Sequence, residues 1–145
     1  PIFSRAQVLA AATLAGLAAA AKNMATEHAA TRIQFDKPIG VNQAVKHMCA
    51  DMAVSADASI SQTLFAAIAL QSGRDDSEFQ ILSAKSVAAR AAIDNAAHSI
   101  QVHGGMGYTY EHNAHLVLKR AHVFAHLFGE PTDVLAQLLQ QGAAQ

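Results

Sequence analysis

The stretch QVHGGMGYTY, residues 101–110, places three glycines within four positions directly after a run of helix-forming residues. Glycine is favoured where the backbone turns sharply or comes close to another group. Upstream of it, apolar residues recur at helical spacing: Leu82, Ala89, Ile93, Ala96 and Ile100. The pattern predicts a helix over about residues 77–102, begun by a cap at Asp76 or Ser77 and ended by the glycines.

Two further long helices are expected before this one. The first covers about residues 4–33 and is ended by FDKPIG, residues 35–40, because proline and glycine interrupt the pattern. The second runs from a cap at Asn42 to about residue 72. Their predicted buried faces are Leu14, Leu17, Ala21 and Met24 in the first helix, and Val45, Met48, Cys49, Met52, Ile60, Leu64 and Ala67 in the second.

After the glycines, a fourth helix is expected over about residues 111–128, followed by Gly129, Pro131 and the short amphipathic tail TDVLAQLLQQ. Short connections between long amphipathic helices favour antiparallel neighbours. We therefore expect one all-α domain over residues 1–145, an up-and-down four-helix bundle with a short additional C-terminal helix. The many alanines favour close helix contacts.

Composition narrows the classes of function. The chain is 52% hydrophobic, has a formal net charge of −1 and contains one cysteine. Nucleic-acid binding is not favoured by scattered basic groups, and a disulfide framework is excluded; Cys49 is expected to be a buried structural thiol. RAQVLAAATLAGLAAAA, residues 5–21, has features of a signal peptide or membrane span, but its alanine, glutamine and threonine content favours a soluble helix.

The histidines suggest a metal site, since His112 and His115 are three apart and His122 and His126 four apart on the predicted fourth helix. Because no third ligand completes a known motif, we expect no metal site. GGMG is not a dinucleotide fingerprint either, since the residues before it are predicted to be helical. Cys49 lies on a predicted buried face and no serine stands on a glycine-flanked elbow, which leaves no nucleophile.

Two polar positions remain, each with two interpretations. Arg32 lies near a helix end. Either it is solvated and interacts favourably with the helix dipole, or its guanidinium group binds a phosphate. Gln101 either caps a carbonyl or contacts a ligand beside Gly104 and Gly105. Composition alone favours the first role for both residues, a solvated arginine at a helix end and a glutamine that caps a carbonyl.

Two segments resemble the C-terminal helical domain of the acyl-CoA dehydrogenase flavoproteins. They are TRIQFDKPIGVNQAVKHMCADM, residues 31–52, and AIDNAAHSIQVHGGMGYTYEHNAHLVLKRA, residues 92–121. The resemblance implies FAD shared across a subunit interface. The cofactor-binding residues carried over by position are Arg32, Gln34, Phe35, Gln101, Val102, His103, Gly104 and Gly105.

The family reaction is α,β-dehydrogenation of acyl-CoA thioesters, in which a glutamate removes a proton and a hydride passes to the flavin. The positions that match the family's base hold Phe128 and Ala6, and neither can accept a proton. Glu130 stands two residues beyond Phe128 and is a further candidate for the base. The form HGGMGYTYEH resembles bacterial branches acting on acyl-CoA or steroid side-chain CoA, which implies a cytoplasmic location.

The resemblance also implies partners. Family members carry an N-terminal helical domain and a middle β domain that this chain lacks, so we expect it to be part of a longer protein and to bind FAD weakly or not at all alone. We expect a homo-oligomer, or a hetero-oligomer with a homologous subunit that carries the base. An electron-transfer flavoprotein is an expected electron acceptor. A bundle kept only for assembly is the alternative.

Overall fold

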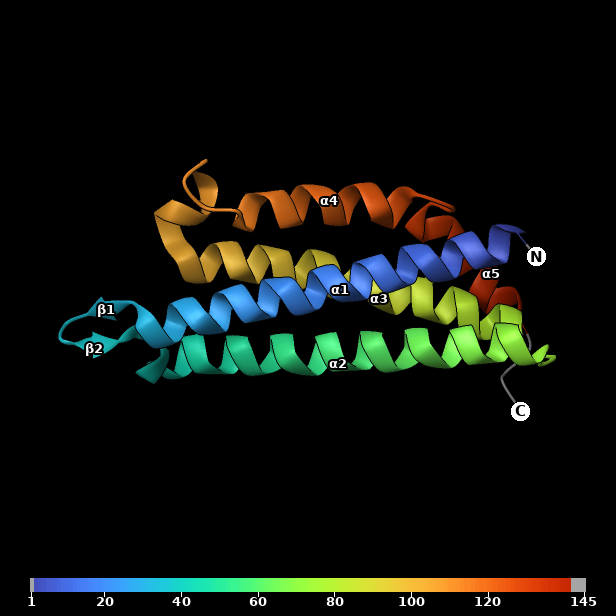
Figure 1. Cartoon of the computed structure of the whole chain (residues 1–145), viewed down its shortest axis with the longest axis horizontal. Helices are drawn as coiled ribbons and strands as arrows, with labels where there is room; N and C mark the ends of the chain where they lie inside the picture. Colours follow the sequence, from blue (N-terminus) through green and yellow to red (C-terminus); the bar gives the residue numbers. More distant parts are fainter. Residues whose placement is uncertain (1, 142–145) are drawn as a thin grey trace.

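The computed structural model describes residues 2–141 and confirms the all-α class (Figure 1). In chain order its elements are α1 (Ile2–Thr31), β1 (Ile33–Gln34), β2 (Lys37–Pro38), the 3-10 turn η1 (Ile39–Val41), α2 (Gln43–Ser72), α3 (Ser77–His103), the 3-10 segment η2 (Gly104–Tyr108), α4 (Ala114–His126) and α5 (Pro131–Gln140). The predicted up-and-down four-helix bundle with a short last helix is the observed architecture.

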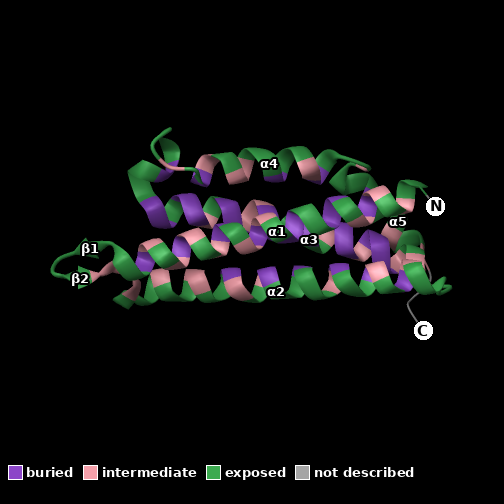
Figure 2. Cartoon of the chain, viewed as in Figure 1, coloured by how far each residue is buried: buried purple, intermediate pink, exposed green. Residues whose placement is uncertain are grey.

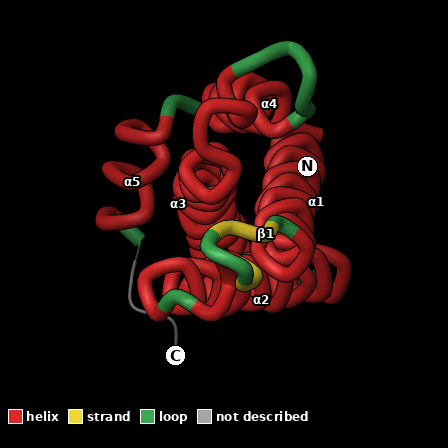
Figure 3. Tube along the Cα trace, turned by 90° about the vertical axis from the view of Figure 1, so that its left-hand side faces the viewer, coloured by secondary structure: helices red, strands yellow, loops and turns green. Residues whose placement is uncertain are grey.

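Viewed along the bundle, α1 and α3 form the central pair, with α2 on one side and α4 on the other (Figure 3). Helix α5 packs against α3. β1 and β2 form a small antiparallel hairpin in which Ile33 pairs with Pro38, and it extends from one end of the bundle. The N-terminus and α5 lie at the opposite end.

The core is built mainly from alanine, and it follows the inner faces of the helices (Figure 2). Its largest cluster contains Leu14, Ile81 and many alanines of α1 and α3. Because alanine ends at Cβ, the helices can approach closely while each still buries an apolar stripe. The alanine-rich composition is thus the local cause of the tight packing between α1 and α3.

The predicted buried face of α2 is right in its first half and wrong in its second. Met52 is fully buried, but Leu64 is 60% exposed and Ile60 37% exposed. The residues buried along α2 are small or slim: Met52, Ala56, Ser59, Thr63, Ala66 and Ala69. Close approach to α1 and α3 selects the small side chains for the inner face, and the larger ones turn outward.

Several polar side chains inside the bundle have partners on the backbone, whereas the buried Ser99 hydroxyl group has no hydrogen-bond partner among residues 2–141. The Ser59 and Thr63 hydroxyl groups donate to carbonyl oxygens of their own helix, at 2.8 and 2.7 Å. Asn95 of α3 is 1% exposed and its amide nitrogen donates to the Ala18 carbonyl at 3.2 Å and to the Met52 carbonyl at 2.9 Å. One side chain therefore ties three helices together near the middle of the bundle.

Helix ends differ from the predictions in detail. Asn42 and Asp76 occupy the predicted N-cap positions of α2 and α3, but neither side chain makes a capping hydrogen bond. The Asn42 amide donates back to the Ile39 carbonyl, and the Asp76 carboxylate pairs with Arg74. Helix α4 begins at Ala114 rather than near residue 111, because the residues after η2 form turns.

By length and composition alone, α1 and α2 are apolar enough to cross a membrane. The core helices of a bundle pass the same test, because they are long and one side of each is buried. In the structure both helices contribute their alanine faces to the bundle core. Packing within the bundle thus accounts for one apolar face of each helix, while about two thirds of the most apolar stretch of each helix stays outside the core.

Candidate functional site at the hairpin end of the bundle

The glycines that follow α3 lie in different structural environments. Gly104 ends the helix with φ +62°, a backbone region that glycine adopts without strain. A Cβ atom on Gly107 would lie 2.7 Å from the Ile100 carbonyl oxygen, so only glycine fits there. Gly104 and Gly105, in contrast, face open space. The backbone next to the end of α3 is therefore left uncovered by side chains on one side.

The hairpin brings the end of α1 to the same place. The Ile39 amide donates to the Arg32 carbonyl oxygen at 2.9 Å, which folds the chain back after β2. Gly40 lies so close to α1 that a Cβ atom added to it would be 2.8 Å from the carbonyl oxygen of Ala29. The PIG segment thus turns the chain against α1 and leaves Arg32 and Gln34 beside the start of α2.

Seven of the eight predicted cofactor-binding residues line one hollow of about 640 Å³. They are Arg32 and Gln34 from the hairpin side and Gln101, Val102, His103, Gly104 and Gly105 from the end of α3. His28, Asn42 and Met48 complete parts of its wall. A cation, three amide side chains and a bare glycine backbone therefore converge at one surface depression, which suits an anionic ligand.

Phe35 is the predicted residue that does not join this hollow. It is 96% exposed at the tip of the hairpin and has φ +51°, a left-handed conformation that is uncommon for phenylalanine. A bulky side chain held outward in a strained turn is available to another subunit. Its predicted contact with a cofactor stays a prediction.

The sequence-based interpretation missed two histidines of the site. His28 of α1 and His112, in the turn before α4, stack on either side of His103. The expected pairing of His112 with His115 on one helix is wrong, because His112 precedes α4. Only the folded arrangement places these three rings together, since they come from segments far apart in the sequence.

The opposite end of the bundle holds Phe128 and Ala6, the positions that the sequence resemblance predicts to match the family's base. Phe128 has φ +61° and its ring packs edge-on against Phe3, with the centroids 6.4 Å apart. The Gln7 amide donates to the Phe128 carbonyl oxygen at 3.1 Å. Since Ala6 immediately precedes Gln7, the two alternative base positions of the family lie in one region, and neither carries an acid.

Glu130 lies just beyond this turn, as the residue before α5. Its carboxylate is 3.4 Å from Nε2 of His126, and its side chain is 57% exposed. In this domain the carboxylate is thus largely solvated and lies beside a histidine rather than in an apolar pocket. A role for Glu130 as the base stays a prediction.

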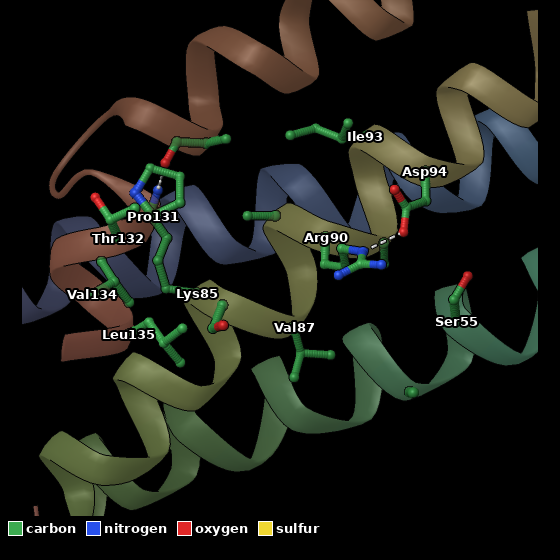
Figure 4. A pocket seen from close by; sticks show the side chains of 15 residues that line it. Ser55, Lys85, Val87, Arg90, Ile93, Asp94, Pro131, Thr132, Val134 and Leu135 are labelled. Carbon is green, nitrogen blue, oxygen red and sulfur yellow. Dashed lines mark hydrogen bonds and ion pairs between the residues drawn. The ribbon is translucent and has the colours of Figure 1, made fainter. Parts of the chain in front are cut away.

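A second hollow of about 640 Å³ lies between α2, α3 and α5 (Figure 4). It is mostly apolar and is bordered by Val87, Ile93 and Leu135, with the Arg90–Asp94 ion pair at one side. Lys85 reaches its inner end. Burial lowers the pKa of Lys85 to about 8, and the negative charge of Glu130 opposes that effect.

The two ends of the bundle are far apart. His28 lies in the last turn of α1 and Arg32 follows the helix directly. Phe3 and Gln7 lie at the start of the same helix. A helix of 30 residues is about 45 Å long. The hairpin-end hollow and the base-position turn of one copy therefore cannot face the same small reacting group.

Other candidate chemistry is limited. Within residues 2–141, no group of three histidine, cysteine, aspartate or glutamate side chains has the arrangement that holds a metal ion. Cys49 is half-buried rather than fully buried, and burial raises the pKa of its thiol. A raised pKa keeps the thiol protonated and unreactive at neutral pH, which agrees with a structural role.

Comparison with known proteins agrees with this geometry. Residues 2–143 match the family model of the acyl-CoA dehydrogenase C-terminal domain. The chain is 45% identical over 116 residues to acyl-CoA dehydrogenase FadE34 of Mycobacterium tuberculosis, covering 77% of this chain and 16% of the relative. It is 36% identical over 137 residues to acyl-CoA dehydrogenase IpdE2 of the same organism, covering 94% of this chain and 41% of the relative.

Among solved structures, butyryl-CoA dehydrogenase from Megasphaera elsdenii superposes with a TM-score of 0.89 at 26% sequence identity. The match covers 96% of this chain and 37% of that protein. The chain thus spans well under half the length of these relatives. Its helices, its hairpin and its glycine turn are those of one domain, and the chain belongs to the acyl-CoA dehydrogenase family, as its C-terminal domain.

Proposed function

We propose that this chain is the C-terminal part of an FAD-dependent acyl-CoA dehydrogenase, where it contributes cofactor contacts and an oligomer interface. The observation that carries the proposal is the convergence of Arg32, Gln34 and residues 101–105 on one hollow. These residues come from two separate segments of the chain. A guanidinium group beside backbone that no side chain covers suits a dinucleotide diphosphate.

Bound FAD would supply the hydride acceptor for oxidation of an acyl-CoA thioester between its α and β carbons. The role of this chain's residues is to hold the cofactor. Arg32 would face the diphosphate, Gln101 would donate or accept a hydrogen bond beside it, and Gly104 and Gly105 would let the ligand approach the main chain.

The proton-accepting base is proposed to come from a homologous partner subunit. Phe128 and Ala6 occupy the matching positions here and neither is acidic. Because the hairpin-end hollow and the base-position turn lie at opposite ends of the bundle, they would serve different active sites of one oligomer. A subunit without a base can still complete the cofactor site of its neighbour.

The apolar residues that face outward support assembly. Leu9, Val54, Leu64 and Ile68 are each more than half exposed on α1 and α2. Exposed apolar surface of this kind marks contact with other chains. We infer a homo-oligomer or a hetero-oligomer with an acyl-CoA dehydrogenase subunit, located in a bacterial cytoplasm.

The substrate is proposed to be a fatty or steroid side-chain acyl-CoA, and the electrons are proposed to leave to an electron-transfer flavoprotein. Both inferences rest on the resemblance of the HGGMGYTYEH segment. The residues that would contact the acyl chain lie mainly in regions of the relatives that this chain does not span.

The test is flavin retention by the assembled protein, purified with the domains and partner it has in its source. Arg32→Ala combined with Gln101→Ala should reduce bound flavin, measured by absorbance near 450 nm, at least tenfold. Arg120→Ala, which changes an exposed arginine on α4, is the matched control. Loss of flavin only in the double variant supports the proposal.

The second candidate function is a bundle kept for assembly alone. It is favoured by the absence of an acid at Phe128 and Ala6. If the double variant keeps its flavin and its oligomeric state, this second candidate replaces the first.

A further inference from the structure

Three histidine rings form a continuous stack beside the hairpin-end hollow. The centroid of His103 lies 4.3 Å from that of His28 and 4.0 Å from that of His112, with interplanar angles of 28° and 34°. His103 is only 6% exposed and occupies the middle of the stack. The rings join the end of α1, the end of α3 and the turn before α4.

Hydrogen bonds fix where protons sit in this stack. Nδ1 of His103 lies 2.6 Å from the Ser99 carbonyl oxygen, which can only accept, so this nitrogen carries a hydrogen. Nδ1 of His112 accepts the backbone N–H of Ala114 at 3.1 Å, so it carries none. Placing a second proton on His112 would break the bond that positions the first residue of α4.

The surroundings of the stack disfavour added positive charge. Burial lowers the pKa of His28, and the charges of His103, His112 and Arg32 lower it further. Burial also lowers the pKa of His112, and the charges of His103 and His115 lower it further.

The charged groups that face the stack come from two sides. Helix α1 supplies Glu27, which borders a small hollow of about 260 Å³ beside the rings, and Arg32 follows directly after this helix. Helix α4 supplies His115. The part of α2 that lines the neighbouring hollow contributes no charged side chain: Ala44, Val45 and Met48. Among the described residues that line the two hollows, Glu27 is the only acidic one.

The stack is also part of the proposed cofactor hollow. His28 and His103 line that hollow together with Arg32, and they line the small hollow with His112 as well. An anion bound beside Arg32 would therefore add negative charge next to the rings. Negative charge favours the protonated form of a nearby imidazole, and the coupling acts equally in both directions.

We propose that the stack of His28, His103 and His112 takes up a proton when a dinucleotide diphosphate binds in this hollow. The coupling rests on the proposed cofactor site and goes beyond it, because it makes cofactor affinity depend on pH. Binding tightens as pH falls from about 7.5 to 5.5, since linkage of one proton allows up to a tenfold change in affinity per pH unit. At neutral pH, uncharged His28 and His112 favour release.

The test uses ADP-ribose, whose diphosphate diester keeps its charge across this pH range. Imidazole C–H resonances of the assembled protein, purified with its native domains and partner, freed of flavin and isotopically labelled at histidine, are titrated by NMR with and without the nucleotide, and the dissociation constant is measured at pH 7.5, 6.5 and 5.5. We expect the pKa of at least one stack histidine to rise on binding, and the dissociation constant to fall at least threefold over that range.

Variants separate the stack from other histidines. His28→Gln with His112→Asn should flatten the pH dependence of affinity, while His47→Gln, an exposed position on α2, should leave it unchanged. Circular dichroism checks that the double variant stays helical, and the titration of the unaltered chain decides the question if it does not.

Three other outcomes would contradict the proposed coupling. Equal affinity at all three pH values overturns the proton coupling and leaves the cofactor hollow in place. Absence of binding at every pH overturns both. Binding that keeps its pH dependence in Arg32→Ala places the nucleotide elsewhere and also overturns the inference.

Discussion

Lys85 on α3 holds the C-terminal end of α4 through a 2.8 Å hydrogen bond from its Nζ atom to the carbonyl oxygen of Ala125. A second bond of the same length reaches the Phe124 carbonyl. The last carbonyls of a helix lack partners within the helix, and a cation there also meets the negative end of the helix dipole. Since its pKa is about 8, Lys85 is mostly protonated at pH 7.

Lys85→Met should lower the free energy of unfolding by about 1–3 kcal/mol, because it removes the donor for two carbonyl oxygens at a buried position. Urea denaturation followed by circular dichroism measures the change. Lys46→Met, on the exposed side of α2, is the matched control and should change stability by less than about 0.5 kcal/mol. Equal stability of the two variants would show that water replaces the ammonium group.

Asn95→Ala should lower the free energy of unfolding by at least about 2 kcal/mol, because it leaves a small cavity and unpaired polar groups. The lost partners are the carbonyls of Ala18 and Met52 and the Ser55 hydroxyl group, which donates to Asn95 at 2.8 Å. Asn23→Ala, exposed on α1, is the control in the same denaturation experiment. A small loss at Asn95 would contradict its role as a tie between three helices.

Gly107→Ala and Gly105→Ala should have opposite phenotypes. The first should destabilise the fold by about 1–3 kcal/mol, since its new Cβ would meet the Ile100 carbonyl oxygen at 2.7 Å and the backbone must shift. The second has open space around it and should leave the melting temperature unchanged. In the assembled protein, Gly105→Ala should instead weaken flavin retention, because the side chain enters the proposed cofactor hollow. Reversed effects would contradict both assignments.

Local signals in the sequence were sufficient for the fold. The glycines after His103, the proline and glycine near Gly40 and the apolar spacing in α3 each act on neighbouring residues, so their effect is visible without tertiary structure. The second half of α2 was different. Leu64 and Ala66 both fit a helical face, and only the close approach of α1 and α3 decides that the smaller one turns inward.

The candidate site could be predicted only in part. Arg32 and Gln101 followed from motifs in two segments, and the structure brings both to one hollow. The histidine stack could not be found this way, because His28, His103 and His112 follow no common spacing and meet only after the bundle forms. Contacts between segments distant in sequence depend on the packing of the helices and not on any local pattern.

The stability of the ligand-free chain should decrease on acidification. The pKa values of His28 and His112 are lowered from 6.5 in the folded chain, so the unfolded chain binds more protons below that value. Stability is therefore full above about pH 6.5 and is lost as pH falls toward the lowered values. Melting temperatures between pH 5 and pH 7.5 measure this, and His28→Gln with His112→Asn should reduce the slope. An unchanged slope would assign the acid sensitivity to other groups.

Glu130→Gln should leave dehydrogenation by the assembled protein within about twofold of the unaltered rate, because the carboxylate is exposed and paired with His126 rather than held in an apolar site. Asp133→Asn, a neighbouring acidic position on α5, is the control. The rate and the bound flavin are measured together, so that loss of cofactor is not mistaken for loss of chemistry. A fall of several orders of magnitude in Glu130→Gln alone, with flavin still bound, would make Glu130 the base and remove the need for a partner to supply one. An unchanged rate would agree with a base supplied by a partner subunit, since Phe128 and Ala6 have no group that can take a proton.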